Sequence, residues 1–151
     1  MIRIDIPATS ANLGSGFDSL GIALTMCNRV WMEEADELKI TTTDKIKVPT
    51  DETNLIYWAA RHLYQICGKT LPGLHIIQEN NIPMARGLGS SSACIVAGIL
   101  GANRMLGSPM SQSDLINLAA QIEGHPDNTS PAISGGLVAS ACLLYTSDAA
   151  D

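Results

Sequence analysis

The ten residues from Ala93 to Ala102, ACIVAGILGA, are small or apolar at every position, with no charged side chain among them. A helix that is apolar on all sides is stable only when it is buried on all sides. Gly107 and Pro109 follow, in the usual order for a helix that ends there. The sequence therefore predicts a central helix enclosed by other elements, and 46% apolar residues are enough to bury such a core.

The remaining segments predict strands on both sides of a first helix. Ile2, Ile4 and Ile6 alternate with polar residues as in a half-buried strand, which we expect Pro7 to end. The order of strands, helix, strand, two helices and strand predicts an α+β fold. The other expected elements are strands over 20–24, 28–34 and 38–42 (the last two as an antiparallel hairpin), a helix from Thr53 or Asn54 to Gly68, a strand over 74–78, a helix capped by Ser111 with Asp114 and closed by Gly124, and a strand over 135–144.

Charge and composition argue against several partners. The net charge is -6 and no Lys/Arg cluster is present, so we expect neither nucleic acid nor an anionic membrane surface as a partner. No apolar run approaches the ~20 residues of a membrane span, and the amino terminus is unlike a signal peptide. Four cysteines lie far apart, which makes a zinc site unfavourable and fits packing thiols in a cytoplasmic protein.

The segment PMARGLGSSSA, Pro83 to Ala93, is the first candidate site. Gly87 and Gly89 permit positive φ and a close approach by a ligand, and we expect Ser90 or Ser91 to cap the buried helix. The amino terminus of that helix offers unpaired N–H groups and a positive dipole end, which suits an anion. The alternative is a flexible capping turn without a ligand, and local sequence favours neither interpretation.

The segment IEGHPDNTSPAISGG, Ile122 to Gly136, is the second. Glu123 falls at a predicted helix C-terminus, where the dipole disfavours a carboxylate unless a cation such as Mg²⁺ lies nearby. Alternatively, Asp127 and Asn128 cap the next element and Glu123 points to water. His125 is disfavoured as a metal ligand because no second His or Cys lies at ligand spacing.

The segment PATSANLGSGFDSLG, Pro7 to Gly21, is the third. Asn12, Ser15 and Asp18 lie on a predicted loop after the first strand, a common place for substrate contacts. The alternative is an Asx-type turn in which Asn12 and Asp18 bond to their own backbone, and the segment by itself favours that interpretation.

In order and spacing, the three segments together resemble the GHMP small-molecule kinases, and within them the homoserine kinases. PMARGLGSSSA is similar to the superfamily's phosphate loop, P-x-x-x-G-L-G-S-S, and IPATSANLGSGFDSLGIAL and EGHPDN…PAISGG resemble homoserine kinase segments. The resemblance implies the GHMP-kinase amino-terminal domain, with the fold named after ribosomal protein S5 domain 2. It implies transfer of the ATP γ-phosphate to L-homoserine in threonine biosynthesis.

The resemblance also implies roles for individual residues. Asn12, Asp18 and Asn128 would contact homoserine, Ser91 and Glu123 would hold Mg²⁺, and no residue is assigned as a general base. Asn54 would form part of the adenine site. The ATP phosphates would lie on Pro83, Met84, Ala85, Arg86, Gly87, Leu88, Gly89, Ser90, Ser91, Ser92 and Ala93.

Homoserine kinases are about twice as long as this chain, and the resemblance implies a homodimer for the full-length protein. We therefore interpret residues 1–144 as the ATP-binding domain and 145–151 as a non-native tail, and expect the chain alone to be poorly soluble or inactive. Two alternatives are another GHMP kinase acting on a different small alcohol, such as mevalonate or a diphosphocytidyl sugar alcohol, and an inactive nucleotide-binding fragment.

Overall fold

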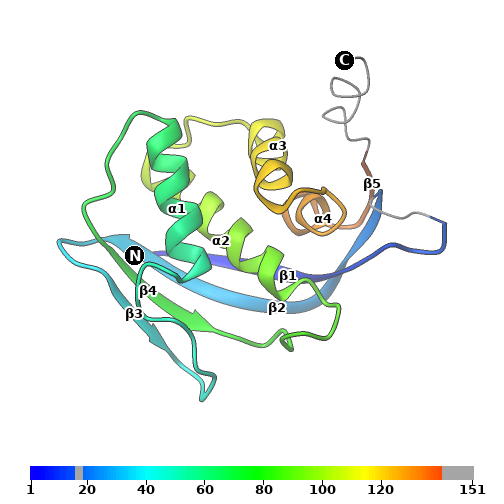
Figure 1. Ribbon diagram of the computed structural model, residues 1–151, viewed down its shortest axis with the longest axis horizontal. Helices are drawn as coiled ribbons and strands as arrows, with labels where there is room; N and C mark the ends of the chain where they lie inside the picture. Colours follow the sequence, from blue (N-terminus) through cyan, green and yellow to red (C-terminus); the bar gives the residue numbers. More distant parts are fainter. Residues whose placement is uncertain (16–18, 141–151) are drawn as a thin grey trace.

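The computed structural model describes residues 1–15 and 19–140, and it places the helices on one face of a mixed sheet (Figure 1). The α+β expectation is confirmed. The predicted tail, residue Asp18 and the end of the predicted last strand lie outside the described residues. The elements are β1 (Ile2–Ala11), β2 (Leu20–Glu34), β3 (Lys39–Thr42), α1 (Leu55–Ile66), β4 (Leu74–Glu79), α2 (Ser90–Met105), α3 (Gln112–Glu123), α4 (Thr129–Ser134) and β5 (Leu137–Ala139).

The strand order is β1-β2-β4-β3, and β5 pairs with β2 beside this path. The expected antiparallel hairpin between residues 28–34 and 38–42 is wrong, because β3 pairs in parallel with β4. β4 takes the place next to β2, with Met32 opposite Ile76, and Ile40 pairs with the other side of Ile76. The chain from β3 to β4 passes through α1, the kind of helical crossover that a parallel pair requires.

β1 continues past Pro7 to Ala11, so the expectation that Pro7 ends the strand is also wrong. β1 is an edge strand of the order, and its register with β2 shifts between Pro7 and Thr9. A proline lacks the N–H that a central strand needs, but an edge or a bulge tolerates it. The two strands expected over 20–24 and 28–34 form the single strand β2.

The core lies between the sheet and the central helix α2, as the apolar run predicts. Ile4, Ile6 and Met32 are buried on the helix-facing side of the sheet. A Cβ on Gly98 would lie 2.3 Å from the Ile56 carbonyl oxygen, and one on Gly101 would lie 2.3 Å from Met32 Sδ. These glycines therefore let α2 approach α1 and β2 closely.

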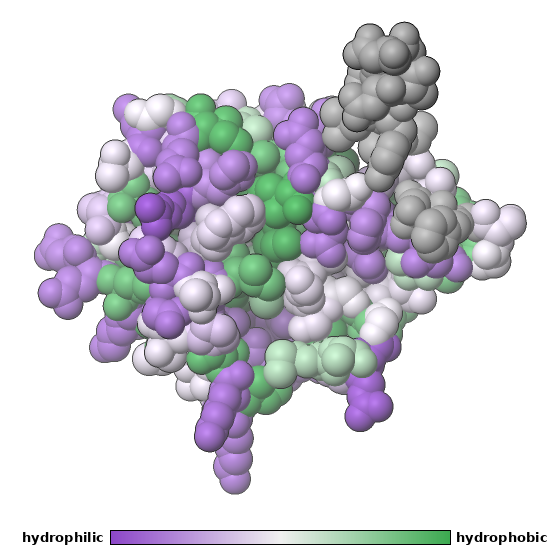
Figure 2. Space-filling view, in the orientation of Figure 1, coloured by the Kyte–Doolittle hydropathy of each residue, from purple (hydrophilic) through white to green (hydrophobic). Residues whose placement is uncertain are grey.

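The predicted capping box of Ser111 with Asp114 on α3, which ends at Gly124, is confirmed. Asn54, near the predicted start of the first helix, is the N-cap of α1. The short helix α4 is not predicted by the sequence. No helix in residues 1–15 and 19–140 has the length and apolarity to cross a membrane. Figure 2 shows apolar side chains in a band across the middle of one face, between hydrophilic regions.

Candidate functional site

The segment from Pro83 to Ser90 is a loop that leads into the start of α2. Ala85, Gly87 and Gly89 have φ of 55°, 68° and 69°. The expected capping by Ser90 or Ser91 is wrong, because Gly89 occupies the N-cap and no side chain makes a capping hydrogen bond. The first-turn N–H groups of α2 are therefore left for another partner at the positive end of the dipole.

Gly89 is held against β1 by a close contact with Thr9. A Cβ on Gly89 would lie 2.2 Å from Thr9 Oγ1 and 3.4 Å from Asn128 Oδ1. The Thr9 hydroxyl donates to Asn128 Oδ1 at 2.7 Å, and the Thr9 backbone N–H donates to the Leu88 carbonyl at 3.1 Å. Thr9, which is 1% exposed, thus joins the loop to the segment before α4. Sequence reasoning missed it, since Thr9 fell in a predicted loop with no signal of its own.

The loop borders a pocket of about 220 Å³ at the start of α2, and two other predicted residues reach the same pocket. They are Glu123, at the end of α3, and Asn128, just before α4. Residues from two of the three predicted segments thus converge on one space although the segments are far apart in the sequence. The lining is Pro83, Ala85, Arg86, Gly87, Leu88, Gly89, Ser90, Ser91, Ser92, Glu123 and Asn128.

Glu123 does not point to water, as one interpretation of the sequence held, because its Oε1 accepts a 2.9 Å hydrogen bond from Ser92 Oγ. Ser91, the serine predicted to share a metal with Glu123, lines the same pocket and is exposed. Among residues 1–15 and 19–140, no three His, Cys, Asp or Glu side chains form a metal cage. A carboxylate and hydroxyls beside an uncapped helix amino terminus nevertheless fit Mg²⁺ with a phosphate ligand, because Mg²⁺ keeps most of its ligands from water and phosphate.

The polar residues after Glu123 have structural partners. His125 Nδ1 lies 2.6 Å from Asp127 Oδ1, and Asp127 is 1% exposed. Asn128 occupies the N-cap of α4 but makes no side-chain capping bond, contrary to the capping interpretation. Its side-chain Oδ1 instead accepts the hydrogen bond from the Thr9 hydroxyl.

The predicted substrate loop is only partly described. Asn12 has φ of 57°, and its N–H donates to the Leu20 carbonyl at 3.1 Å. Asn12 is not among the described residues that line the loop pocket, and Asp18 lies outside the described residues. The structure thus brings Asn128, but not Asn12, to the pocket beside the Pro83–Ser90 loop.

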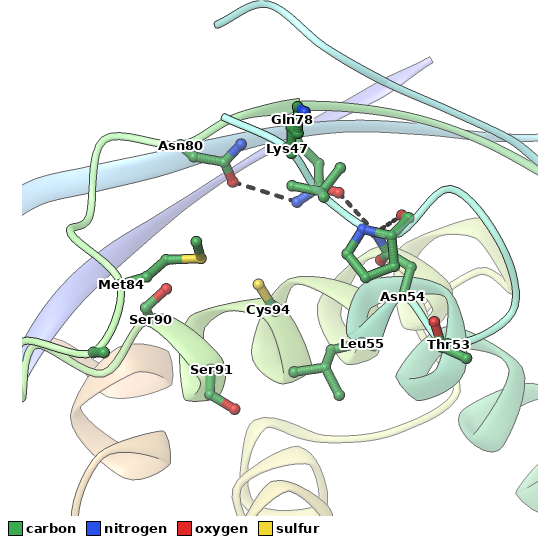
Figure 3. Close-up of a pocket in the computed structure, with 13 residues that line it drawn as sticks. Lys47, Thr53, Asn54, Leu55, Gln78, Asn80, Met84, Ser90, Ser91 and Cys94 are labelled. Carbon is green, nitrogen blue, oxygen red and sulfur yellow. Dashed lines mark hydrogen bonds between the residues drawn. The ribbon is translucent and has the colours of Figure 1, made fainter. Parts of the chain in front are cut away.

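A second pocket of about 270 Å³ adjoins the first, and the two share Ala85, Ser90 and Ser91 (Figure 3). Its lining is mostly apolar and includes Leu55 and Met84 as well as Asn54, the residue predicted for an adenine site. Cys94 also lines it, and burial raises the pKa of the Cys94 thiol to about 11. An apolar pocket beside an anion site suits a nucleotide, whose base is flat and whose phosphates are charged.

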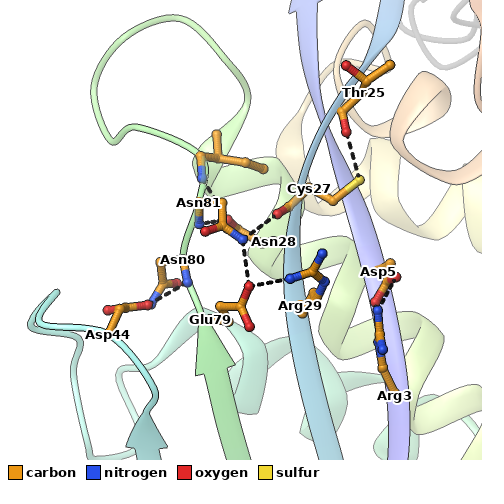
Figure 4. A network of polar contacts seen from close by, with 11 residues as sticks. Arg3, Asp5, Thr25, Cys27, Asn28, Arg29, Asp44, Glu79, Asn80 and Asn81 are labelled. Atoms are coloured by element: carbon orange, nitrogen blue, oxygen red, sulfur yellow. Dashed lines mark hydrogen bonds and ion pairs between the residues drawn. The ribbon is translucent and has the colours of Figure 1, made fainter.

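A polar contact behind the loop fixes the chain that leads into it (Figure 4). Asn28 on β2 is 5% exposed, and its Oδ1 accepts from the N–H groups of Asn81 at 2.7 Å and Ile82 at 2.8 Å. Beside it, the hydrogen bond from Asn81 and the charge of Arg29 lower the pKa of Glu79. Asn28 was missed from the sequence, because its partners lie more than 50 residues away.

Comparison with known proteins gives one consistent result. The family "GHMP kinases N terminal domain" matches residues 54–136, just over half of the chain. A homoserine kinase of Petrotoga mobilis is 47% identical over 146 residues, covering 95% of this chain and 48% of that protein. A homoserine kinase of Trichodesmium erythraeum is 50% identical over 140 residues, covering 89% of this chain and 46% of that protein.

A solved structure agrees in fold. The homoserine kinase of Cytophaga hutchinsonii superposes with a TM-score of 0.81 at 31% identity, covering 93% of this chain and 48% of that one. The chain spans about half the length of the curated relatives it matches. The matched family region contains the glycine-containing loop before α2, the buried helix α2 and Glu123. The chain belongs to the GHMP kinase family.

Proposed function

We propose that this chain supplies the ATP-binding part, and part of the substrate site, of a homoserine kinase. The reaction is transfer of the ATP γ-phosphoryl group to the hydroxyl of L-homoserine, giving ADP and O-phospho-L-homoserine. The observation that carries the proposal is the uncapped amino terminus of α2, which adjoins the pocket holding Glu123 and Asn128. Homoserine kinases that are 47% and 50% identical support the choice of substrate.

In this proposal the ATP phosphates lie against the Pro83–Ala93 segment. The backbone N–H groups of the first turn of α2 donate to phosphate oxygens, and Gly87 and Gly89 keep the approach free of side chains. The base occupies the neighbouring apolar pocket beside Asn54. The continuity of the two pockets through Ser90 and Ser91 supports this placement.

The proposed metal is Mg²⁺, held by Ser91 and Glu123. Bound there, it would neutralise charge on the phosphate oxygens, and phosphoryl transfer depends on positioning and charge neutralisation more than on covalent catalysis. The hydrogen bond from Ser92 fixes one oxygen of Glu123, which leaves the other oxygen free to face the pocket.

Asn12, Asp18 and Asn128 are the proposed contacts of homoserine. Asn128 has the strongest support, since its Oδ1 is held by Thr9 while the residue lines the pocket. No side chain is assigned as a general base. The protein would act in the cytoplasm in threonine biosynthesis, as a homodimer when full length, without nucleic acid or membrane partners.

Two measurements test the proposal. Isothermal titration calorimetry on the purified chain should show ATP binding that is stronger with Mg²⁺ than without it. A chimaera should then join residues 1–140 of this chain to the second half of the Petrotoga mobilis relative. Mass spectrometry should detect phosphohomoserine from the chimaera with ATP, and a matched Glu123→Gln chimaera should form much less.

The results distinguish the alternatives. A chimaera that phosphorylates mevalonate in preference to homoserine would indicate another GHMP kinase. ATP binding by the chimaera with no phosphorylated alcohol would indicate a nucleotide-binding fragment. A wild-type chain that binds no ATP would contradict the proposed phosphate site itself.

A further inference from the structure

Asn54 lines the apolar pocket, but the protein already uses all of its side-chain hydrogen-bonding groups. Its Oδ1 accepts from the N–H groups of Ile56 at 3.0 Å and Tyr57 at 3.4 Å. Its Nδ2 donates to the Pro49 carbonyl and to Gln78 Oε1, both at 2.9 Å. A primary amide has two donors and two acceptor positions, so none is left for a ligand. The residue is also only 3% exposed.

A chain of hydrogen bonds leads on from Asn54 through Gln78 and Asn80 to Asp44. Gln78, which is 3% exposed, donates from Nε2 to Asn80 Oδ1 at 3.4 Å. Asn80 donates to Asp44 Oδ2 from its backbone N–H at 2.6 Å and from Nδ2 at 3.2 Å. Asp44 Oδ1 in turn accepts from the Ile46 N–H at 2.8 Å. We call Asp44, Asn54, Gln78 and Asn80 the amide network.

The amide network spans a segment that has no helix or strand of its own. Residues 43–54 run from the end of β3 to the start of α1 outside any regular element, and Lys47, Val48 and Pro49 in this segment line the pocket. Ser90, Ser91 and Cys94 of α2 lie on the opposite side (Figure 3). The network holds the segment near its start, through the bonds of Asp44 to Asn80, and in its middle, through the bond of Pro49 to Asn54.

We infer that the amide network is a positioning device that preforms the base pocket, and that Asn54 does not itself recognise the base. The base would instead be held by the shape of the pocket and by apolar contacts, with Asn54 acting through the 43–54 segment. This inference rests on the proposed function for the identity of the ligand. The preformed pocket is a property of the protein alone and is open to measurement without a ligand.

Three variants separate positioning from general stability. Asn54→Ser keeps an oxygen that can cap α1 but removes both donors to Pro49 and Gln78. Asp44→Ala releases the start of the segment, at a part-exposed position where folding is less at risk. Ser111→Ala is the matched control, because it removes a comparable N-cap from α3 and no residue from the pocket.

The first measurement is the labelling rate of Cys94 with iodoacetamide at fixed pH, resolved from the other cysteines by peptide mass spectrometry. We expect both network variants to label Cys94 at least about fivefold faster than wild type, as expected for roughly one net hydrogen bond. Ser111→Ala should label at the wild-type rate. Unchanged labelling in both network variants would overturn the inference.

The second measurement is the dissociation constant for ATP with Mg²⁺ by calorimetry. It should rise about fivefold or more in Asn54→Ser and Asp44→Ala, by the same reasoning, and stay unchanged in Ser111→Ala. If the network variants label Cys94 faster but keep the wild-type dissociation constant for ATP, the role of the network in base binding is overturned. If wild type binds no ATP, the proposed function fails while the labelling rates still decide whether the network holds the pocket.

Discussion

Gly87 and Gly89 form a matched pair that tests the packing of the loop before α2. Both have positive φ, 68° and 69°, so Gly87→Ala and Gly89→Ala each incur the cost of a left-handed residue, about 1–2 kcal/mol. No atom lies within 4 Å of a Cβ added at Gly87. A Cβ at Gly89 would lie 2.2 Å from Thr9 Oγ1, which must move.

Moving the Thr9 hydroxyl breaks its 2.7 Å hydrogen bond to Asn128. Breaking a buried hydrogen bond costs about 1–3 kcal/mol, so we expect Gly89→Ala to destabilise the fold by roughly that much more than Gly87→Ala. Urea unfolding followed by tryptophan fluorescence gives both free energies, since the chain has two tryptophans.

A double-mutant cycle identifies the cause. Thr9→Ala removes the hydroxyl that obstructs the new Cβ. In the Thr9→Ala background, Gly89→Ala should therefore lower the free energy of unfolding by at least about 1 kcal/mol less than it does in wild type. Equal destabilisation by Gly87→Ala and Gly89→Ala, or strict additivity with Thr9→Ala, would refute the reasoning.

Three further predictions concern the site and its support. Glu123→Gln should weaken ATP binding about tenfold with Mg²⁺ but not without it, because the amide keeps the Ser92 bond and loses the charge; calorimetry measures both. Asn28→Ala should destabilise by about 2 kcal/mol in urea, since two buried N–H groups lose their acceptor, and Asn28→Asp should lose less. Burial raises the pKa of Cys94 from 9.0 to about 11, so the native state keeps a proton that the unfolded chain loses. Stability should therefore fall from pH 9 to 11 by about 2 kcal/mol more in wild type than in Cys94→Ala, measured by urea unfolding.

Local chemistry explains which parts of the fold could be predicted from sequence. The buried helix, the helix start near Asn54 and the Ser111 capping box depend on residues within a few positions of each other. The pairing of β3 with β4 depends on residues 36 apart, Ile40 and Ile76, and no local pattern specifies it. The prediction that Pro7 ends the first strand was wrong because an edge strand tolerates a proline. Whether a strand lies at an edge is decided only by the assembled sheet.

The residues of the candidate site likewise divide into those that local sequence could predict and those that it could not. Gly87, Gly89 and Glu123 could be singled out because a glycine loop and a carboxylate at a helix end are anomalous in themselves. Thr9 could not, since its partner Asn128 lies 119 residues away. Asn54 was singled out, but the bonds that occupy its amide come from Pro49 and Gln78 and appear only in three dimensions.

The position of β2 between β1 and β4 also has a consequence for synthesis on the ribosome. β1 and β2 can pair as soon as Glu34 has emerged, but β4 begins at Leu74, 40 residues later. At roughly 5–20 residues per second, the free edge of β2 waits roughly 2–8 s for its partner. During that interval the edge can pair with a neighbouring nascent chain. A chaperone bound to the nascent β1–β2 hairpin would cover this edge of β2 until β4 emerges.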